Sequence, residues 1–198
     1  MATFADIPLT MQIQHNMETS CKPAQIETVL HDDLRQYLLS LGRIDEHFPE
    51  APDIEGLWPK VAESYMADGI REFGDSPVVS LAWMMYTGMA LAKYWDTDWQ
   101  LYSQVDDLYA YLRDQRGFDR MDDYICEQVL LLPAADHERL THVAGECGAR
   151  VYSFLVRQRL EPGTREAFEA YVAAIHQMYL MGMAMELKTL GYHMTKMG

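Results

Sequence analysis

Two side chains that could form a polar site lie on the last predicted helix, about residues 164–190. His176 and Glu186 follow one line along it, and Glu186 is the only acidic residue between Tyr171 and the C-terminus. A carboxylate among apolar neighbours has its charged form disfavoured and titrates high unless it is paired. We take both as candidate catalytic residues. The alternative interpretation places Glu186 at the rim beside Lys188.

The dipeptide His31-Asp32 offers a second hypothesis. It resembles the dipeptide that names the HD metal-dependent phosphohydrolases, which are all-helical and need a further upstream histidine and a downstream aspartate. That resemblance implies roles for His15 and Asp107. Two adjacent residues are a weak motif, and Asp32 points away from the apolar face of its predicted helix.

A ladder of potential metal ligands, Glu138, His142 and Glu146, has the spacing i, i+4, i+8 on a predicted helix. The same face also holds Arg139 and Arg150 and lies opposite the apolar residues. This pattern favours a solvated charge ladder over a metal site.

Three Asp-Asp pairs occur, at 32–33, 106–107 and 122–123. Carboxylates one turn apart can hold magnesium against a diphosphate, as in the DDxxD box of isoprenoid synthases. The fifth positions here are instead Gln36, Ala110 and Cys126. We therefore interpret the pairs as solvated faces or helix caps, and we expect no bound metal and no cofactor.

Aromatic residues gather in the middle of the chain, where ten of the 22 lie between Trp83 and Tyr124. Aromatic walls rimmed by carboxylates can bind a flat or cationic ligand. Candidate ligand-binding residues are Trp83, Trp95, Trp99 and Tyr102. A core of large residues with a solvated edge gives the same pattern, and we favour that interpretation.

The sequence contains no nucleophile elbow, glycine-rich phosphate loop or HExxH motif. Its three cysteines, Cys21, Cys126 and Cys147, are far apart and form no CxxC pair, which favours reduced thiols over disulfides or a zinc site. The N-terminus has no basic and apolar pattern of a signal peptide. We therefore expect a cytoplasmic protein.

Charge is distributed unevenly along the chain, whose formal net charge is −14. Residues 1–136 carry −15 and residues 137–198 carry +1. This acidity opposes binding to a phosphate backbone, so we expect no nucleic-acid partner. The uneven distribution favours docking of one end against the other, within the chain or across a dimer.

Apolar residues recur every three or four positions, which predicts an all-α fold. We expect a single-domain bundle of about seven helices over residues 23–191 and a frayed tail over 192–198. Residues 1–22 form an N-terminal arm for which two alternatives stay open, an extended strand-like segment or a helix over residues 11–21. The predicted helices span 23–41, 57–73, 77–95, 99–116, 119–132, 135–160 and 164–190. The very apolar 77–95 segment is interpreted as a buried central helix that does not cross a membrane.

Packing positions follow from the same periodicity. Gly88 and Ala92 are small residues one turn apart, where a neighbouring helix can approach closely. Ile70 and Phe168 fall in register with the apolar stripes of their helices. We expect both on core-facing sides.

The last helix is apolar on nearly its whole circumference, so it must be enclosed on nearly all sides. Either it is the central helix of the monomer, or a second subunit covers one face. The sequence therefore favours a non-catalytic association or partner-binding protein acting as a homodimer. A helical-bundle enzyme or small-ligand-binding protein is the alternative. The methionines concerned are Met178, Met181, Met183 and Met185.

Overall fold

The computed structural model describes residues 22–47 and 51–192, and within them it confirms an all-α bundle without strands. The N-terminal arm, with His15 and Cys21, lies outside the described residues apart from Lys22. The same holds for the tail beyond residue 192. The predictions for those segments therefore stay predictions.

Eight α-helices form this part of the chain, together with one short 3₁₀-helix and one π-helix. The α-helices are α2 (Pro23–Ser40), α3 (Pro52–Glu55), α4 (Trp58–Asp75), α5 (Pro77–Tyr102), α6 (Leu108–Arg116), α7 (Met121–Tyr124), α8 (Ala134–Arg157) and α9 (Arg165–Thr189). The 3₁₀-helix is η1 (Phe118–Arg120), and the π-helix is η2 (Ile125–Val129).

Helix starts follow local chemistry. Proline occupies the first turn of α2, α3, α4 and α5, where the missing N–H costs no helical hydrogen bond. The Thr164 side chain caps α9 by accepting a hydrogen bond from the Ala167 N–H at 3.2 Å. Gly163 precedes it with a φ of +80°, which a side chain would disfavour. This turn sends α9 back along α8.

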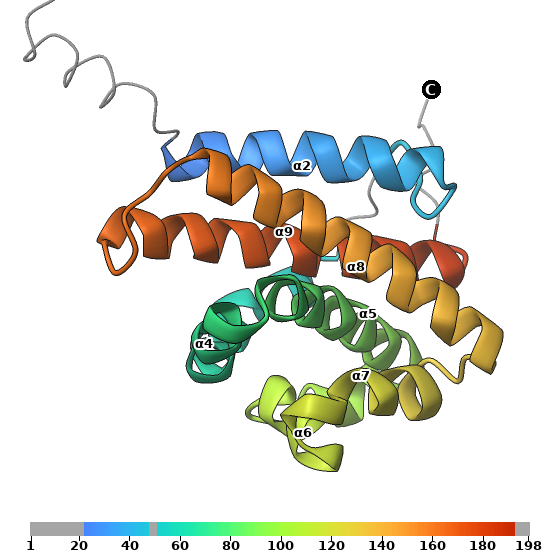
Figure 1. Cartoon of the computed structure of the whole chain (residues 1–198). Helices are drawn as coiled ribbons and strands as arrows, with labels where there is room; N and C mark the ends of the chain where they lie inside the picture. Colours follow the sequence, from blue (N-terminus) through green and yellow to red (C-terminus); the bar gives the residue numbers. More distant parts are fainter. Residues whose placement is uncertain (1–21, 48–50, 193–198) are drawn as a thin grey trace, which may run out of the picture.

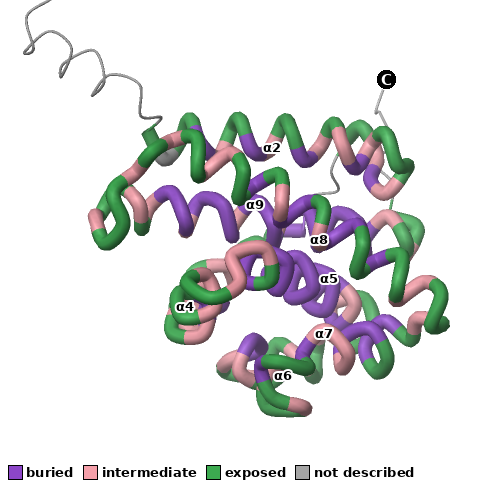
Figure 2. The backbone as a smooth tube through the Cα atoms, in the orientation of Figure 1, coloured by how far each residue is buried: buried purple, intermediate pink, exposed green. Residues whose placement is uncertain are grey.

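Helices α5 and α9 form the centre of the molecule, where most of their residues are buried (Figures 1 and 2). Helix α9 packs against α5, α2 and α8, and α4 packs against α5. Helix α6 lies at the opposite end from α2 (Figure 1). Among the described residues, no helix combines the length and hydrophobicity needed to cross a lipid bilayer.

The crossing of α5 and α9 depends on one glycine from each helix. A Cβ added to Gly88 would overlap with the Tyr179 carbonyl oxygen, and one added to Gly182 would overlap with the Met85 carbonyl oxygen. Backbone therefore lies against backbone at this crossing, as the small residues of the sequence predict. Ala92, one turn beyond Gly88, is also fully buried.

The predicted boundary between helices 77–95 and 99–116 coincides with a kink in α5, whereas the prediction of one unbroken helix over 99–116 is wrong. Helix α5 continues to Tyr102 through a kink at Asp98, where φ is −161° and ψ is 77°. The Asp98 side chain accepts a hydrogen bond from the Leu101 N–H at 3.0 Å, so it caps the last turn inside the merged element. Helix α6 begins only at Leu108.

The single helix predicted over 119–132 is also wrong in its geometry. The chain forms a 3₁₀ turn, one α-turn and then the π-helix η2. Leu131 follows with a φ of +56°, and it is 70% exposed. Apolar periodicity alone does not distinguish these three helix types.

Two residues expected on core-facing sides are exposed. Ile70 on α4 is 49% exposed and Phe168 on α9 is 45% exposed. Both lie on the side where these helices diverge, so no third element covers them. They line a groove that is described below.

Replacing Gly182 with alanine should lower the free energy of unfolding by at least about 2 kcal/mol, because the new methyl group forces α5 and α9 apart. Gly145→Ala on α8 is the matched control, since its Cβ would meet no atom within 4 Å. The control should stabilise the chain by up to about 1 kcal/mol through helix propensity. Urea unfolding followed by circular dichroism measures both, and equal stabilities would contradict the close crossing.

Candidate functional site

Glu186 is buried, with 4% of its surface exposed, on the side of α9 that faces α5. Burial raises the pKa of its carboxyl to about 7, the nearby Lys93 lowers it, and Asp96 raises it further. Within the described part of the chain this carboxyl has no hydrogen bond. Desolvation therefore disfavours its charged form, as the apolar neighbours in the sequence predict.

His176 is half-buried and has different surroundings. Its ring stacks on Trp58 of α4, with centroids 4.5 Å apart, and its Nδ1 lies 3.2 Å from Glu27 Oε1 on α2. These contacts tie α9 to its two neighbours. They give the imidazole a structural role at the helix packing surface.

The two candidates do not share a site. Ten residues of helix separate His176 from Glu186, which corresponds to about 15 Å along the axis. Their neighbours also differ, since His176 contacts α2 and α4 while Glu186 lies beside Lys93 and Asp96 of α5.

The phosphohydrolase-like set is likewise dispersed. His31 Nδ1 lies 3.2 Å from Gln177 Oε1 on α9, and Asp32 is exposed on α2. Asp107 caps α6 by accepting from the Ala110 N–H at 2.9 Å, and it also accepts from the Ser64 hydroxyl at 2.6 Å. Because α2 and α6 lie at opposite ends of the molecule, these residues do not converge (Figure 1).

The ladder on α8 is exposed along its whole length, at Glu138, His142 and Glu146. Glu138 and His142 border a shallow hollow of about 520 Å³ that also includes Arg43 and Arg139. Arginines beside these side chains oppose the binding of a cation. The geometry is that of a solvated ladder.

The aromatic candidates are spread along α5. Trp83 is buried, whereas Trp95, Trp99 and Tyr102 are half-buried around the far end of the helix. Trp95 donates to Asp53 Oδ2 at 3.3 Å, and Tyr102 stacks on Tyr94 with centroids 3.9 Å apart. These rings pack against the core of their own chain.

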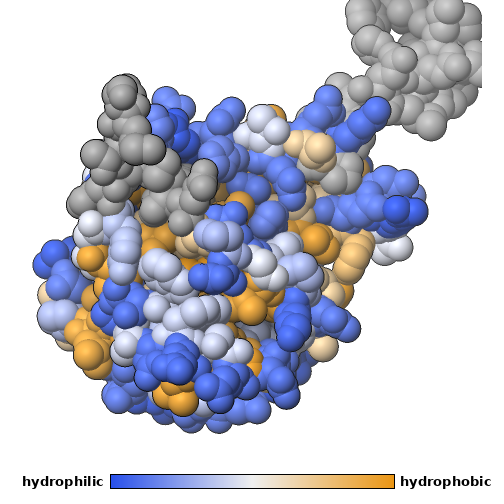
Figure 3. All heavy atoms as spheres, turned by 180° about the vertical axis from the view of Figure 1, so that it is seen from behind, coloured by the Kyte–Doolittle hydropathy of each residue, from blue (hydrophilic) through white to orange (hydrophobic). Residues whose placement is uncertain are grey.

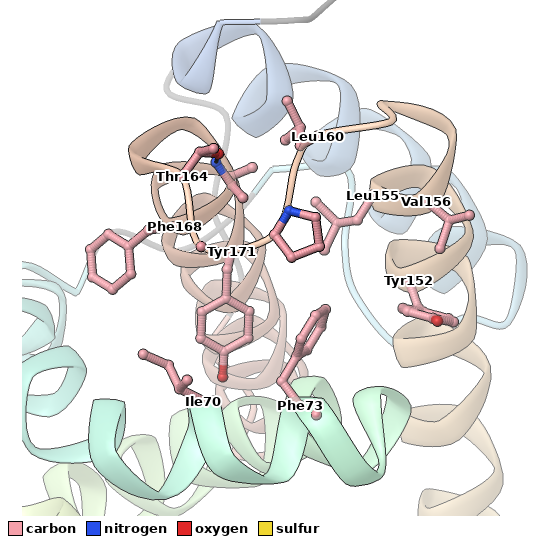
Figure 4. Close-up of a pocket in the computed structure, with 14 residues that line it drawn as sticks. Ile70, Phe73, Tyr152, Leu155, Val156, Leu160, Thr164, Phe168 and Tyr171 are labelled. Carbon is pink, nitrogen blue, oxygen red and sulfur yellow. Dashed lines mark hydrogen bonds between the residues drawn. The ribbon is translucent and has the colours of Figure 1, made fainter.

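Another cavity is a groove that sequence analysis did not identify. It lies where α4, the end of α8 and the start of α9 meet, and its volume is about 560 Å³ (Figure 4). Helix α4 contributes Ile70 and Phe73, and α9 contributes Phe168 and Tyr171 (Figure 4). The end of α8 and the following turn contribute Tyr152, Leu155, Val156 and Leu160. We call this the α4/α8/α9 groove.

The floor of the groove is fixed by a buried hydroxyl network. The Tyr171 and Ser80 hydroxyls are 2.8 Å apart, and the Ser80 hydroxyl donates to the Gly69 carbonyl at 2.8 Å. Phe73 packs edge-on against Tyr171, with centroids 4.9 Å apart. Burial raises the pKa of Tyr171 to about 12, so this hydroxyl stays neutral at physiological pH. The groove thus offers rigid apolar walls and no acid–base pair.

Only one signal in the sequence could have indicated this groove. The stripes that include Ile70 and Phe168 are wider than a single packing face requires. The extra apolar residues of these stripes are visible in the sequence. Which of them stay exposed depends on how the helices pack in the tertiary structure.

Comparisons with known proteins give no information on function, so the proposal below is based on the geometry of the structure. No protein-family model matches the chain, and searches of curated proteins and of solved structures found no match.

The buried carboxyl of Glu186 should make stability depend on pH. Its pKa is about 7 in the folded chain, whereas an exposed glutamate titrates at 4.5. The folded state therefore binds more protons between these values, and stability falls as pH rises through this window. Glu186→Gln should remove this loss. The difference in unfolding free energy between the variant and the wild type should therefore rise by up to about 3 kcal/mol from pH 4.5 to pH 8, in favour of the variant. Chemical denaturation across pH measures the difference.

Glu138→Gln on the exposed face of α8 is the control, and it should leave the profile of the wild type unaltered. If the unfolding free energies of the wild type and Glu186→Gln change in parallel with pH, ionisation of the buried carboxyl does not destabilise the fold.

Proposed function

We propose that this chain is a non-catalytic association domain that forms a homodimer through the α4/α8/α9 groove. The observation that carries the proposal is the cluster of uncovered apolar side chains around this groove. Ile70, Tyr152, Val156 and Phe168 are 49%, 36%, 56% and 45% exposed. Contiguous apolar surface of this kind marks interaction sites on soluble domains.

The groove replaces the C-terminal helix as the expected seam. Met178, Met181, Met183 and Met185 are all buried within one chain, at most 3% exposed. Helix α9 is therefore the central helix of the monomer, the first of the two arrangements that its apolar circumference allows. The homodimer stays a prediction, and its support now comes from α4, α8 and the first turns of α9.

Shape favours a second copy as the occupant. The groove is concave at its floor, where Tyr171 and Phe73 lie, and its edges carry protruding apolar side chains such as Val156 and Phe168 (Figure 4). A surface that has both a hollow and projections can be self-complementary about a two-fold axis. Each protomer would then insert its edge into the hollow of the other.

Charge supports the same occupant. Two copies that each carry −14 repel one another, and hydrophilic residues predominate on the face shown in Figure 3. Residues 152–171, at the groove, hold three arginines and three glutamates and are thus the exception. This is a region where two acidic chains can approach.

The charges at the groove are of both signs, and most of them are unpaired within the described part of the chain. Arg165 is paired with Glu169 at 2.6 Å. Arg157, Arg159, Glu161 and Glu166 form no ion pair within the described part of the chain. Across a two-fold axis the arginines of one protomer can face the glutamates of the other, which supplies the electrostatic complementarity of an isologous contact.

Val156→Asp should convert the dimer to a monomer, because it places a desolvated charge in the centre of the contact. The fold should survive, since Val156 is 56% exposed in the monomer. Light scattering coupled to size exclusion at micromolar concentration should give about twice the chain mass of 22.8 kDa for wild type and the single mass for the variant.

Leu101→Asp is the matched control, because Leu101 is 57% exposed and lies on α5 away from the groove. The control should remain a dimer. A monomer mass for wild type at these concentrations would refute the proposal, as would a Val156→Asp variant that stays dimeric with its helical content intact.

A further inference from the structure

The start of α2 lies level with the rim of the α4/α8/α9 groove. Arg150 Nη1 of α8 lies 3.7 Å from Asp33 Oδ1 of α2. Leu41, further along α2, and Ala135, near the start of α8, border one hollow, so the two helices are antiparallel. Counting ten residues from the contact between Asp33 and Arg150 brings the start of α2 level with Leu160, which lines the groove. Figure 1 shows the blue start of α2 at the same end of the molecule as the orange end of α8.

Helix α9 separates this point from the groove. His176 Nδ1 of α9 lies 3.2 Å from Glu27 Oε1 of α2, whereas Phe168 and Tyr171 of α9 line the groove (Figure 4). Tyr171 and His176 are about 140° apart around the helix axis, so α2 and the groove lie on different sides of α9. An α-helix with its side chains is about 10–12 Å across. The chain that precedes α2 can thus enter the groove by passing around the first turns of α9.

The segment before α2 is long enough for this path. It comprises residues 1–21, which lie outside the described residues. An extended chain spans about 3.3–3.6 Å per residue, so residues 14–21 alone can cover about 26 Å. This distance is about twice the thickness of α9. Residues 7–13 can therefore reach the groove of their own chain.

Residues 7–17 have a composition that suits an apolar groove. They include no Asp, Glu, Lys or Arg, in a chain with 30 acidic and 16 basic residues. Two longer stretches also lack these residues, 77–92 and 170–185, and both belong to the buried centre formed by α5 and α9. A charged segment would lose its hydration in such a groove, whereas an uncharged one gains from the burial of its apolar side chains.

The apolar side chains of residues 7–13 share one side of the chain when it is extended. Successive side chains of a strand point to opposite sides, so alternate residues share a face. The intervening residues are polar or proline, and the shared face holds Ile7, Leu9, Met11 and Ile13. Of the two alternatives for the arm, the extended one therefore presents a continuous apolar strip to the groove walls from α4, α8 and α9.

We propose that residues 7–13 bind in extended form in the α4/α8/α9 groove of their own chain and compete there with a second copy. The binding does not depend on the homodimer, but the competition rests on the proposed function. Attachment to α2 favours the chain's own segment, because a short link between two binding elements gives an effective concentration in the millimolar range. A second copy then binds only to the fraction of chains whose groove is free, which raises the apparent dissociation constant of the dimer.

A spin label on the segment tests the binding directly by NMR. A nitroxide is attached at Gln14→Cys in a Cys21→Ser background, since the other two cysteines are buried. In the full chain, at a concentration where it is monomeric, the label should broaden the amide signals of residues 67–75 and 152–171. Signals of residues 134–142, at the far end of α8, should stay sharp.

Charge on the apolar strip should release the segment. Leu9→Asp should abolish the broadening at the groove, because it places a carboxylate among apolar walls. Gln12→Asp adds the same charge on the opposite side and is the matched control, which should keep the broadening. Circular dichroism should show the helical content of the wild type in both variants. No broadening at the groove with the unaltered strip, or equal broadening in the two variants, would overturn the proposal.

A mixed sample shows whether the segment binds its own chain. Spin-labelled chains without isotope labels are mixed with isotope-labelled chains that carry no nitroxide, so that only binding between chains broadens a signal. The groove signals should stay sharp in this mixture. Broadening in the mixture equal to that in the doubly labelled chain would overturn the assignment to the chain's own groove.

The dissociation constant of the dimer separates this inference from the proposed function. Analytical ultracentrifugation should give Leu9→Asp a dissociation constant at least about tenfold lower than that of the wild type, and Gln12→Asp the wild-type value. Equal constants for the two variants in a chain that dimerises would overturn the competition. If all three chains stay monomeric at every concentration, the homodimer is refuted, and the broadening at the groove still decides whether the segment binds there.

Discussion

The close crossing of α5 and α9 is the contact on which the rest of the structure depends. Gly88 and Gly182 each face a backbone carbonyl of the other helix, so neither position has space for a side chain. Because the two helices are so close, the large residues around them pack on their outer sides against α2, α4 and α8. The crossing thus makes α9 the core of the monomer.

This arrangement determines which apolar surface remains free. The methionines of α9 are buried within the chain. The apolar surface at the α4/α8/α9 groove stays exposed, where α4 diverges from the α8–α9 turn. The turn and its flanks also carry balanced charge, with three arginines and three glutamates over residues 152–171. Apolar exposure and reduced negative charge therefore coincide at the α4/α8/α9 groove, and that coincidence supports self-association there.

Much of the fold could be predicted from the sequence, because prolines, caps and three-to-four-residue spacing act locally. Thr164 caps α9, and Gly88 marks the close approach, as expected. The predicted boundary near Asp98 coincides with a kink at this capping aspartate, but the break between Tyr102 and Leu108 was not predicted. The π-helix over 125–129 was not predicted, because over so short a length its apolar spacing resembles that of an α-helix.

The candidate sites were harder to predict, because a site requires residues from elements whose packing is not encoded locally. Glu186 is buried as its apolar neighbours indicated, yet His176 faces other helices. Asp122 and Asp123 stood out as a pair, but His137, whose ring nitrogen lies within 4.8 Å of a carboxylate oxygen of each, is fourteen positions further along the chain. Such pairing follows only from the tertiary structure.

Hydrogen exchange of the full chain at low and high protein concentration tests the central claim most directly, since it locates the surface that association protects. The account predicts that protection rises with concentration in residues 67–75 and 152–171 and is unchanged in α6. Exchange that is independent of concentration, or protection confined to α5 and α6, would contradict the assignment of the groove as the self-association surface.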